Sequence, residues 1–291
     1  MPNPQLSAVP AAQATKRKNA PRDDEDDDAA SDSGSDVSMI NVDFDFYNLN
    51  EDVDQIAIKR LLRQSLSNDE NLVDVHPLAD LILAESKRMG AGTSIKTDGE
   101  ESDPWGLLAA VDIRRCQAEP GLKPFVDYLL STAPPSTIAS ILDPSNTSRP
   151  AFLFSLRMLN LPLPLVPPLY KMLGSELSEA NFTHYMIWGR GYKLEGTEEA
   201  TGLEMDATVK GNKKKKGGAA GGVGGVPAGK FAYHPEEEMI DARGVAVHNY
   251  ALKTAKPRDD ESFGVEQYGR VVLVETAKLA EAVEAMEEAC R

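Results

Sequence analysis

The spacing of hydrophobic residues changes repeatedly along this chain between two periods. In some segments apolar and polar residues alternate, or apolar residues run together, as they do in β-strands. These segments are 40–47, 93–96, 104–113, 151–159, 182–193, 230–240, 245–252 and 270–274. In other segments apolar residues return every three or four positions, as on one face of an α-helix. These are 50–67, 77–90, 121–131, 135–142, a segment that begins near Pro167, and 276–290.

Local signals set the ends of the first two predicted helices. Asn50 is a suitable N-cap residue, and the acidic residues that follow it favour the positive end of the helix dipole. Pro77 is typical of a helix start, whereas Gly90 and Gly92 predict the end of the second helix. The strands and helices therefore follow one another in alternation, which predicts an α/β fold. The late cluster of strands predicts that part of the sheet is antiparallel.

Two segments have neither period. Residues 1–39 are poor in apolar side chains, and 195–229 combine a lysine run with many glycines. Such compositions do not bury enough apolar surface to offset the entropy of ordering, so we predict a disordered acidic tail and a disordered loop. The loop lies between two strand-like segments, which indicates an insertion and not a domain boundary. We therefore expect one α/β domain at 40–291, with a mixed central sheet flanked by helices and interrupted at about 195–229.

Charge narrows the choice of partners. The chain of 291 residues has a formal net charge of −15. Outside 1–40 and 195–229 it has 33 acidic and 22 basic residues, a net charge near −11. An acidic folded surface repels nucleic acid and anionic lipid and attracts basic proteins over about 8 Å at physiological salt. The apolar stretch 151–173 is broken by charged residues and prolines, which argues against a membrane span.

Two acidic groups flank the late strands and are candidates for contact with a basic client. They are Glu236, Glu237 and Glu238, and Asp259, Asp260 and Glu261. Each group is either an ordinary solvated face or a docking surface on which complementary charge raises the association rate. In the predicted tail, Lys16, Arg17 and Lys18 form a short basic cluster that is either a nuclear import signal or a solvated charge run.

The residues that carry enzyme chemistry do not form a recognisable constellation. Segment 224–231 matches a P-loop except at its last position, where Phe231 replaces the Ser or Thr that binds magnesium. The histidines and the two cysteines lack metal-ligand spacing. The run Lys213 to Lys216 is the one dense basic patch, and it is either an RNA contact, a second import signal or a solvated loop. We therefore predict no enzyme, no cofactor and no metal.

Several motifs of this chain, taken in order, resemble the BCCIP family, and in particular its fungal branch. The resemblance covers roughly 38–194 and 230–288. Its carriers are Val42-Asp-Phe-Asp-Phe-Tyr47, Asp103-Pro-Trp-Gly-Leu107, Ser155-Leu-Arg-Met-Leu-Asn-Leu-Pro162, Pro168-Leu-Tyr170, Phe231-Ala-Tyr-His-Pro-Glu-Glu-Glu238 and Gly269-Arg-Val-Val-Leu273. The chain departs from the family pattern at Leu156, where members usually have an acidic residue.

The resemblance implies a fold like that of the GCN5-related acetyltransferases, without their activity. It also implies a nuclear protein that shuttles to the cytoplasm and escorts a basic ribosomal protein of the large subunit. Nuclear transport factors and a phosphatidylinositol-phosphate kinase are further implied partners, and direct contact with nucleic acid or membrane is not. The acidic composition agrees with an escort for a cationic client. The alternative is an enzyme of the class that binds acetyl-coenzyme A, although the glycine turn that such enzymes use for the pyrophosphate is not found after any predicted strand.

Overall fold

The computed structural model describes residues 42–194, 229–255 and 265–290. The chain divides into two units, and the described residues belong to the second, Val42–Arg291. The predicted tail at 1–39 and the predicted loop at 195–229 fall almost entirely outside the described residues, so both remain predictions.

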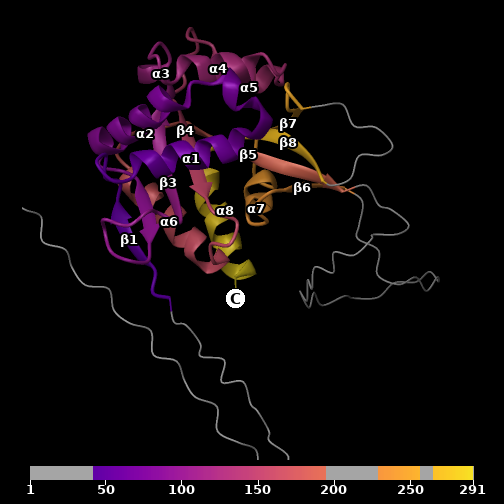
Figure 1. The fold of residues 1–291 in the computed structure, drawn as a ribbon. Coiled ribbons are helices and arrows are strands. Elements are labelled where there is room, and N and C mark those ends of the chain that lie inside the picture. The colour runs from indigo at the N-terminus through magenta and orange to yellow at the C-terminus, as the bar shows by residue number, and fades with distance from the viewer. Residues whose placement is uncertain (1–41, 195–228, 256–264, 291) are drawn as a thin grey trace, which may run out of the picture. The chain divides into compact units, whose positions relative to one another are not determined.

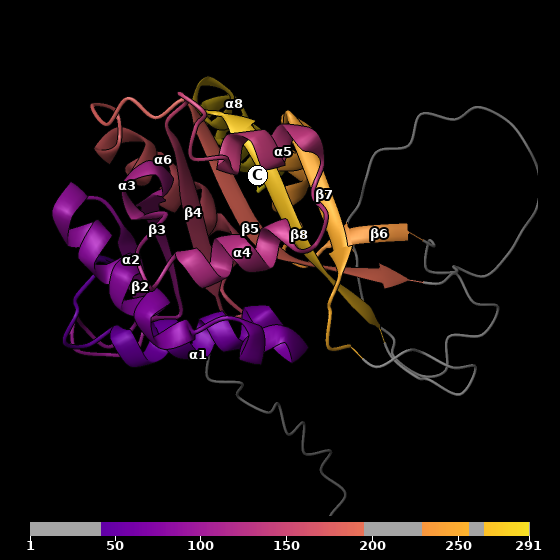
Figure 2. The same ribbon diagram turned by 90° about the horizontal axis from the view of Figure 1, so that it is seen from above.

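The described residues form a mixed sheet with strand order β1-β2-β3-β4-β5-β8-β7, in which β6 also pairs with β5. Figure 2 shows the part of this order from β4 through β5 and β8 to β7. The strands are β1 Asp45–Asn48, β2 Thr93–Lys96, β3 Gly106–Asp112, β4 Pro150–Arg157, β5 His184–Leu194, β6 Gly229–Ala232, β7 Ala246–Ala251 and β8 Glu266–Glu275. The pair β4–β5 is parallel, and the other pairs are antiparallel. A parallel pair needs a crossover, and here helix α6 provides it.

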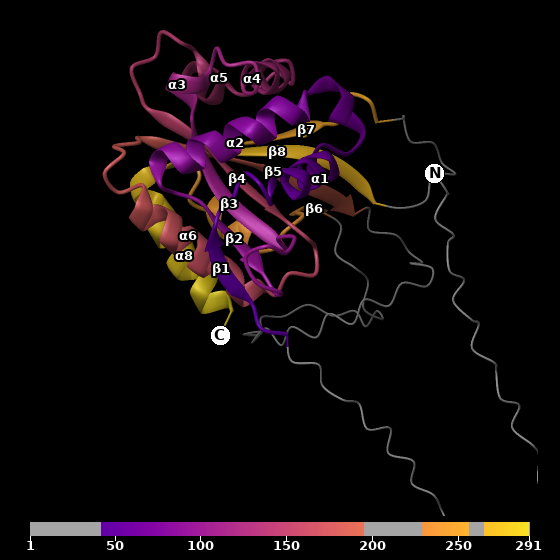
Figure 3. The same ribbon diagram turned by 60° about the vertical axis from the view of Figure 1, so that its left-hand side comes forward.

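Helices cover both faces of the sheet (Figure 1). They are α1 Gln55–Leu66, α2 Val75–Met89, α3 Ile113–Cys116, α4 Lys123–Leu130, α5 Ser136–Leu142, α6 Val166–Glu176, α7 Glu237–Asp241 and α8 Thr276–Ala289, with 3-10 turns at Ser67–Leu72 and Leu163–Leu165. The first five helices share one apolar core with one face of the sheet, and the last three share a second core with the other face. In Figure 3, α6 and α8 lie side by side on this second face.

The alternation of side chains along the strands explains the two cores. In β4, Phe152 and Phe154 face the first core, whereas Ala151 and Leu153 face the second. A strand that is covered on both faces has apolar residues at almost every position, as the sequence of β4 shows. The predicted mixed sheet flanked by helices is therefore confirmed.

Two local predictions are wrong. The first helix begins at Gln55 and not after Asn50, whose side chain instead accepts a hydrogen bond from the Asp52 amide in the preceding turn. Segment 230–240 is not a continuous strand, because β6 ends at Ala232 and α7 begins at Glu237. Pro235 has no amide hydrogen for a strand ladder, and acidic residues are stabilised at the start of a helix.

Candidate functional site

The parallel strands β4 and β5 separate near the middle of the sheet. They are paired from Pro150 and His184 to Phe154 and Trp188. Beyond this point β4 ends at Arg157, while β5 continues and pairs with β6 from Gly191 onward. Open α/β sheets bind ligands at the carboxyl ends of their parallel strands, where neighbouring strands diverge. This position is therefore the first place in the fold at which to look for a site.

Residues of the chain itself occupy this position. Arg157, the last residue of β4, forms an ion pair with Glu236, and the two side chains are 5% and 2% exposed. On the side of β5, a Cβ atom added to Gly189 would lie 3.1 Å from Oε2 of Glu237. The turn before α7 and the first residue of α7 thus fill the gap between the two strands.

A second arginine holds α7 against the sheet. Arg270 of β8 is 1% exposed, and its Nη1 donates to Oε2 of Glu237 at 2.7 Å. Its Nη2 donates to the carbonyl oxygen of Glu237 at 3.2 Å, and its Nε donates to Oδ2 of Asp241 at 3.1 Å. Burial raises the pKa of Glu237, and the positive charges of Arg270 and Arg157 oppose that rise. A buried charge is tolerated only when it is paired in this way.

The surroundings of these ion pairs do not favour acid–base catalysis near neutral pH. Burial, together with the positive charges of Arg157, Arg190 and Arg270, lowers the pKa of His234 to about 3. The imidazole is therefore neutral at physiological pH and is a weak base. Arg190 stacks on the ring of Tyr233, with its guanidinium carbon 4.1 Å from the ring centroid. We interpret the group as an anchor for α7.

This geometry corrects one of the predicted client-binding groups. Glu236 and Glu237 are buried and paired with arginines, so they do not present charge to a client. Glu238 is exposed and remains a candidate. The sequence gives no sign of the pairing, because Arg157 lies 79 residues before Glu236. Asp259, Asp260 and Glu261 lie outside the described residues, as do Lys16, Arg17 and Lys18, and these predictions are not tested.

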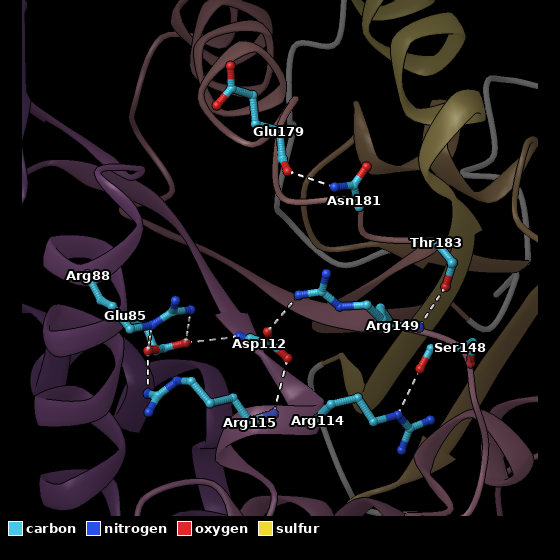
Figure 4. Close-up of polar contacts among 10 residues, drawn as sticks. All are labelled: Glu85, Arg88, Asp112, Arg114, Arg115, Ser148, Arg149, Glu179, Asn181 and Thr183. Atoms are coloured by element: carbon cyan, nitrogen blue, oxygen red, sulfur yellow. Dashed lines mark hydrogen bonds and ion pairs between the residues drawn. The ribbon is translucent and has the colours of Figure 1, made fainter.

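A second polar group joins α2, α3 and the start of β4 (Figure 4). The carboxylate of Glu85 is fully buried and accepts from Nε of Arg88 at 2.7 Å and from Arg115. Asp112 accepts from the Arg115 amide at 3.2 Å and pairs with Nη2 of Arg149 at 3.5 Å. Burial opposes ionisation of Glu85, but the hydrogen bonds from the two arginines outweigh it and lower its pKa to about 2. Two carboxylates at this corner thus bind three arginines.

The neighbouring Arg114 is also held inside the structure. Its guanidinium donates to the carbonyl oxygens of Ser148, Asp143 and Ile141, at 2.9, 2.8 and 2.7 Å. These bonds tie α3 to the end of α5 and to the segment between α5 and β4. An arginine whose donors are used in this way is a connector and not a free anion-binding group.

Two elements of the described chain have several exposed carboxylates close together, and further exposed carboxylates such as Glu70, Asp80 and Glu179 lie elsewhere. The first, which we call the acidic edge, surrounds β1 and the loop between β2 and β3. It consists of Asp43, Asp45, Glu51, Asp52, Asp98, Glu100, Glu101 and Asp103. Three of these residues, Glu51, Asp52 and Glu100, line a cavity of about 400 Å³. Lys87 pairs with Glu51 and Arg60 with Asp103, at 2.6 and 3.1 Å. The second surface is α8, with exposed Glu281, Glu284 and Glu288 and partly exposed Glu287.

Other candidate chemistry receives no support from the geometry. Among the described residues, groups of three or more His, Cys, Asp and Glu that would suit a metal ion do not occur. Burial raises the pKa of the Cys116 thiol to about 12, so this residue is not a thiolate nucleophile. Lys230 and Phe231 lie in strand β6, whereas a P-loop lysine precedes a helix. No helix in the described part of the chain is long and apolar enough to span a membrane.

The fold and its polar groups define a class of protein: a mixed α/β domain in which α7 fills the space at the parallel strands and an acidic surface faces outward. Comparison with known proteins gives the family. The family model described as BCCIP matches residues 39–240, and the chain belongs to the BCCIP family. It is 32% identical to Protein BCP1 of Gibberella zeae over 278 residues, covering 90% of each chain. It is 30% identical to Protein bcp1 of Schizosaccharomyces pombe over 259 residues, covering 82% of this chain and 86% of the relative.

The fold also matches a solved structure. The crystal structure of BCP1 from Saccharomyces cerevisiae aligns with a TM-score of 0.59 at 23% sequence identity, covering 89% of this chain and 94% of that one. At this identity the likeness supports the fold alone.

At Leu156 the resemblance leads one to expect an acidic residue, and the structure shows an apolar setting. Leu156 is 1% exposed, is paired with Leu107 of β3, and belongs to the same apolar core as α1 and α2. A carboxylate at this position would need a buried partner. In this chain the position is apolar and contributes to packing.

Proposed function

We propose that this protein is a non-enzymatic nuclear escort for a basic ribosomal protein of the large subunit, and that it supports ribosome biogenesis. The observation that carries the proposal is the outward-facing negative charge in a member of the BCCIP family. Outside the two segments of low complexity the net charge is near −11. The buried pairs Asp54–Lys96, Glu236–Arg157 and Glu237–Arg270 each cancel internally. The excess is therefore carried by other residues, and many of these are exposed.

Such a surface suits a cationic client. A ribosomal protein has a basic face for RNA, and before assembly this face attracts any polyanion. An acidic protein that covers the face neutralises it and blocks premature contacts. The acidic edge and helix α8 are the two described surfaces on which carboxylates gather, and we propose that one of them contacts the client.

Transport completes the proposal. The escort works in the nucleus and shuttles to the cytoplasm with nuclear transport factors, and it supports export of proteins that include a phosphatidylinositol-phosphate kinase. Import depends on Lys16, Arg17 and Lys18. Replacement of these three residues by alanine moves a fluorescent fusion from the nucleus to the cytoplasm. A fusion that stays nuclear contradicts their role.

The acyltransferase alternative is less well supported. We interpret the sheet as acetyltransferase-like because one parallel pair, β4–β5, lies within an otherwise antiparallel order. However, residues before and within α7 fill the divergence of that pair. The segment from Met158 to Leu165 that follows β4 contains no glycine and includes Pro162 and Pro164, which lack amide hydrogens for a phosphate. Calorimetry with acetyl-coenzyme A tests this alternative, and we expect no heat of binding.

The escort function is tested by direct binding. Purified basic ribosomal proteins of the large subunit are titrated one at a time against the full chain by biolayer interferometry at several salt concentrations. We expect at least one client whose affinity falls steeply as salt rises. The proposal is overturned if none of these ribosomal proteins binds, or if the affinity does not change with salt concentration.

Charge reversal then locates the surface. The variant Glu100→Lys/Glu101→Lys changes the acidic edge, and Glu284→Lys/Glu288→Lys changes α8. The matched variants with glutamine in place of lysine remove the same carboxylates without reversing their charge. At one of the two surfaces we expect the affinity for the client to be lowest in the lysine variant, intermediate in the glutamine variant and highest in the wild type. Equal affinities for all four variants contradict an acidic docking surface on either element.

A further inference from the structure

The two ends of the sheet differ in how they are protected. Edge strands have backbone N–H and C=O groups that are not paired, and proteins usually protect them with charges, prolines or short length. Strand β1 at one end has four residues, and the acidic edge surrounds it. Strand β7 at the other end has six residues, Ala-Val-His-Asn-Tyr-Ala, without a charge or a proline. Within the described residues β7 pairs with β8 alone.

The exposed side of β7 is apolar. Val247 is 37% exposed, and Val245, which directly precedes the strand, is 48% exposed. Both lie among the few large hydrophobic residues of the described chain that are exposed to this degree. Val247 pairs with Val272 of β8, which belongs to the core shared with α6 and α8. The side chain of Val247 thus extends this apolar face to the open end of the sheet.

The opposite side of β7 is held firmly. Tyr250 is buried and accepts a hydrogen bond from Nε1 of Trp188 at 3.1 Å. His248 stacks on Tyr250 with ring centroids 5.3 Å apart, and its Nε2 lies 2.9 Å from Oγ1 of Thr132. These contacts fix the backbone of β7 and leave its outer edge preorganised for a partner strand.

We propose that an extended basic segment of the client protein adds to the sheet as a strand next to β7. This inference rests on the proposed escort function and specifies how the client is held. Strand addition takes its affinity from backbone hydrogen bonds and its specificity from alternate side chains. The segment places apolar side chains beside Val247 and basic ones toward exposed Glu238 of α7, which packs against β8.

Charge selects this occupant over a second copy of the chain. A copy with a net charge of −15 repels another of the same charge. A cationic segment is instead attracted to the protein before it reaches the uncharged strand. Strand addition also gives the escort a grip that does not depend on charge alone, because backbone hydrogen bonds are formed whatever the sequence of the client.

The test uses two substitutions of opposite charge at one position, Val247→Lys and Val247→Glu. Each places a charge where the added strand has an apolar neighbour, so we expect both to weaken binding of the ribosomal protein found by titration, by about fivefold or more. Ile56→Lys and Ile56→Glu are the matched controls, because Ile56 is 73% exposed on α1. Hydrogen–deuterium exchange of the β7 backbone amides, measured with and without client, is an independent test. We expect alternate amides of β7 to become protected when the client binds.

The outcomes separate this inference from the function on which it rests. If the client binds, but Val247→Glu strengthens binding and the β7 amides exchange freely, charge alone acts near β7 and strand addition is wrong, while the escort function stands. If no basic ribosomal protein binds, both proposals fall. If the free protein self-associates and Val247→Glu abolishes this, the strand partner is a second copy and the proposed occupant is wrong. Denaturant melts of each variant ensure that lost binding does not reflect lost folding.

Discussion

The carboxylate of Asp69 accepts a hydrogen bond from the hydroxyl group of Tyr128 at 2.8 Å and from the backbone amides of Lys253 and Thr254 at 2.9 and 2.8 Å. One buried side chain thus joins the turn after α1, helix α4 and the segment after β7. The partners are 59 and about 185 residues away along the chain.

We expect Asp69→Asn to lower the free energy of unfolding by roughly 2–4 kcal/mol, because an amide group replaces an acceptor of several hydrogen bonds. Burial opposes ionisation, but the bonds from Lys253 and Thr254 hold the pKa of Asp69 below its ordinary value of 3.8. Its contribution is therefore complete above pH 3.8 and is lost as the pH falls through the lowered value. Urea denaturation at pH 7 and at pH 3 measures both effects. Asp74→Asn, at an exposed N-cap, is the control, and an equal loss there would contradict the special role of Asp69.

The ion pairs of Glu85 should make a second contribution to stability that is lost at acidic pH. Its pKa is about 2 in the folded protein and 4.5 ordinarily, so the stability that it contributes is lost as the pH falls from about 4.5 toward 2. We expect Glu85→Gln to cost roughly 2–3 kcal/mol at pH 7, because Arg88 and Arg115 lose a charged acceptor. The same substitution at exposed Glu70 is the control. If the two variants unfold at the same urea concentration, the group in Figure 4 does not stabilise the fold.

Much of the fold follows from the sequence, because most strands and helices have a clear period. The predicted strands at 93–96 and 151–159 and the predicted helix at 276–290 correspond closely to β2, β4 and α8. Segments 151–159 and 276–290 are long and rich in apolar residues, so tertiary contacts reinforce the local preference. Segment 93–96 is short and has one apolar residue, Ile95. Segment 230–240 is different, because its alternation of apolar and polar residues imitates a strand while Pro235 and the acidic run favour the start of a helix.

The candidate site was harder to predict for a physical reason. Three consecutive glutamates usually indicate a solvated face. Whether a carboxylate is buried depends on a partner that the fold brings to it, and the partner of Glu237, Arg270, lies 33 residues away on another strand. Composition therefore predicts the total charge of the surface well, but not which acidic residues belong to it.

The pair Arg157–Glu236 is suited to a double-mutant cycle. Removal of either partner leaves a buried charge without compensation, so we expect Arg157→Met and Glu236→Gln each to cost about 3–5 kcal/mol. The double variant should cost clearly less than the sum of the two, because it leaves no charge behind. Thermal or urea unfolding gives the coupling energy. Additive losses would show that the two side chains do not interact.

Replacing each of two glycines by alanine should change the stability of the fold in opposite directions. A Cβ atom on Gly191 would lie 2.2 Å from the ring of Tyr268, so Gly191→Ala should destabilise the fold by about 1–3 kcal/mol. A Cβ atom on Gly174 in helix α6 meets nothing within 4 Å, and alanine is the better helix former. Gly174→Ala should therefore raise stability by about 0.5–1 kcal/mol. Differential scanning calorimetry of both variants decides, and a stabilising Gly191→Ala would contradict the close approach of β5 and β8.

The two cysteines should differ in reactivity. Cys116 is buried with a pKa raised to about 12, whereas Cys290 is partly exposed. We expect a thiol reagent at pH 8 to label Cys290 quickly and Cys116 only after unfolding. Cys290→Ser should abolish the fast labelling. Fast labelling that persists in this variant would mean that the first core opens readily.

The unequal ends of the sheet also set a stoichiometry. Carboxylates surround β1, and the other edge strand, β6, has four residues and includes Lys230. Strand β7 is therefore the longest edge strand in the described part of the chain and has no charged residue. Strand addition there stops after one strand if the client segment has no further open edge. The assembly would then consist of one escort and one guest and would not propagate into a filament. Release of the client would require only that its added strand dissociate from β7. The sheet of the escort would stay intact and could bind another client.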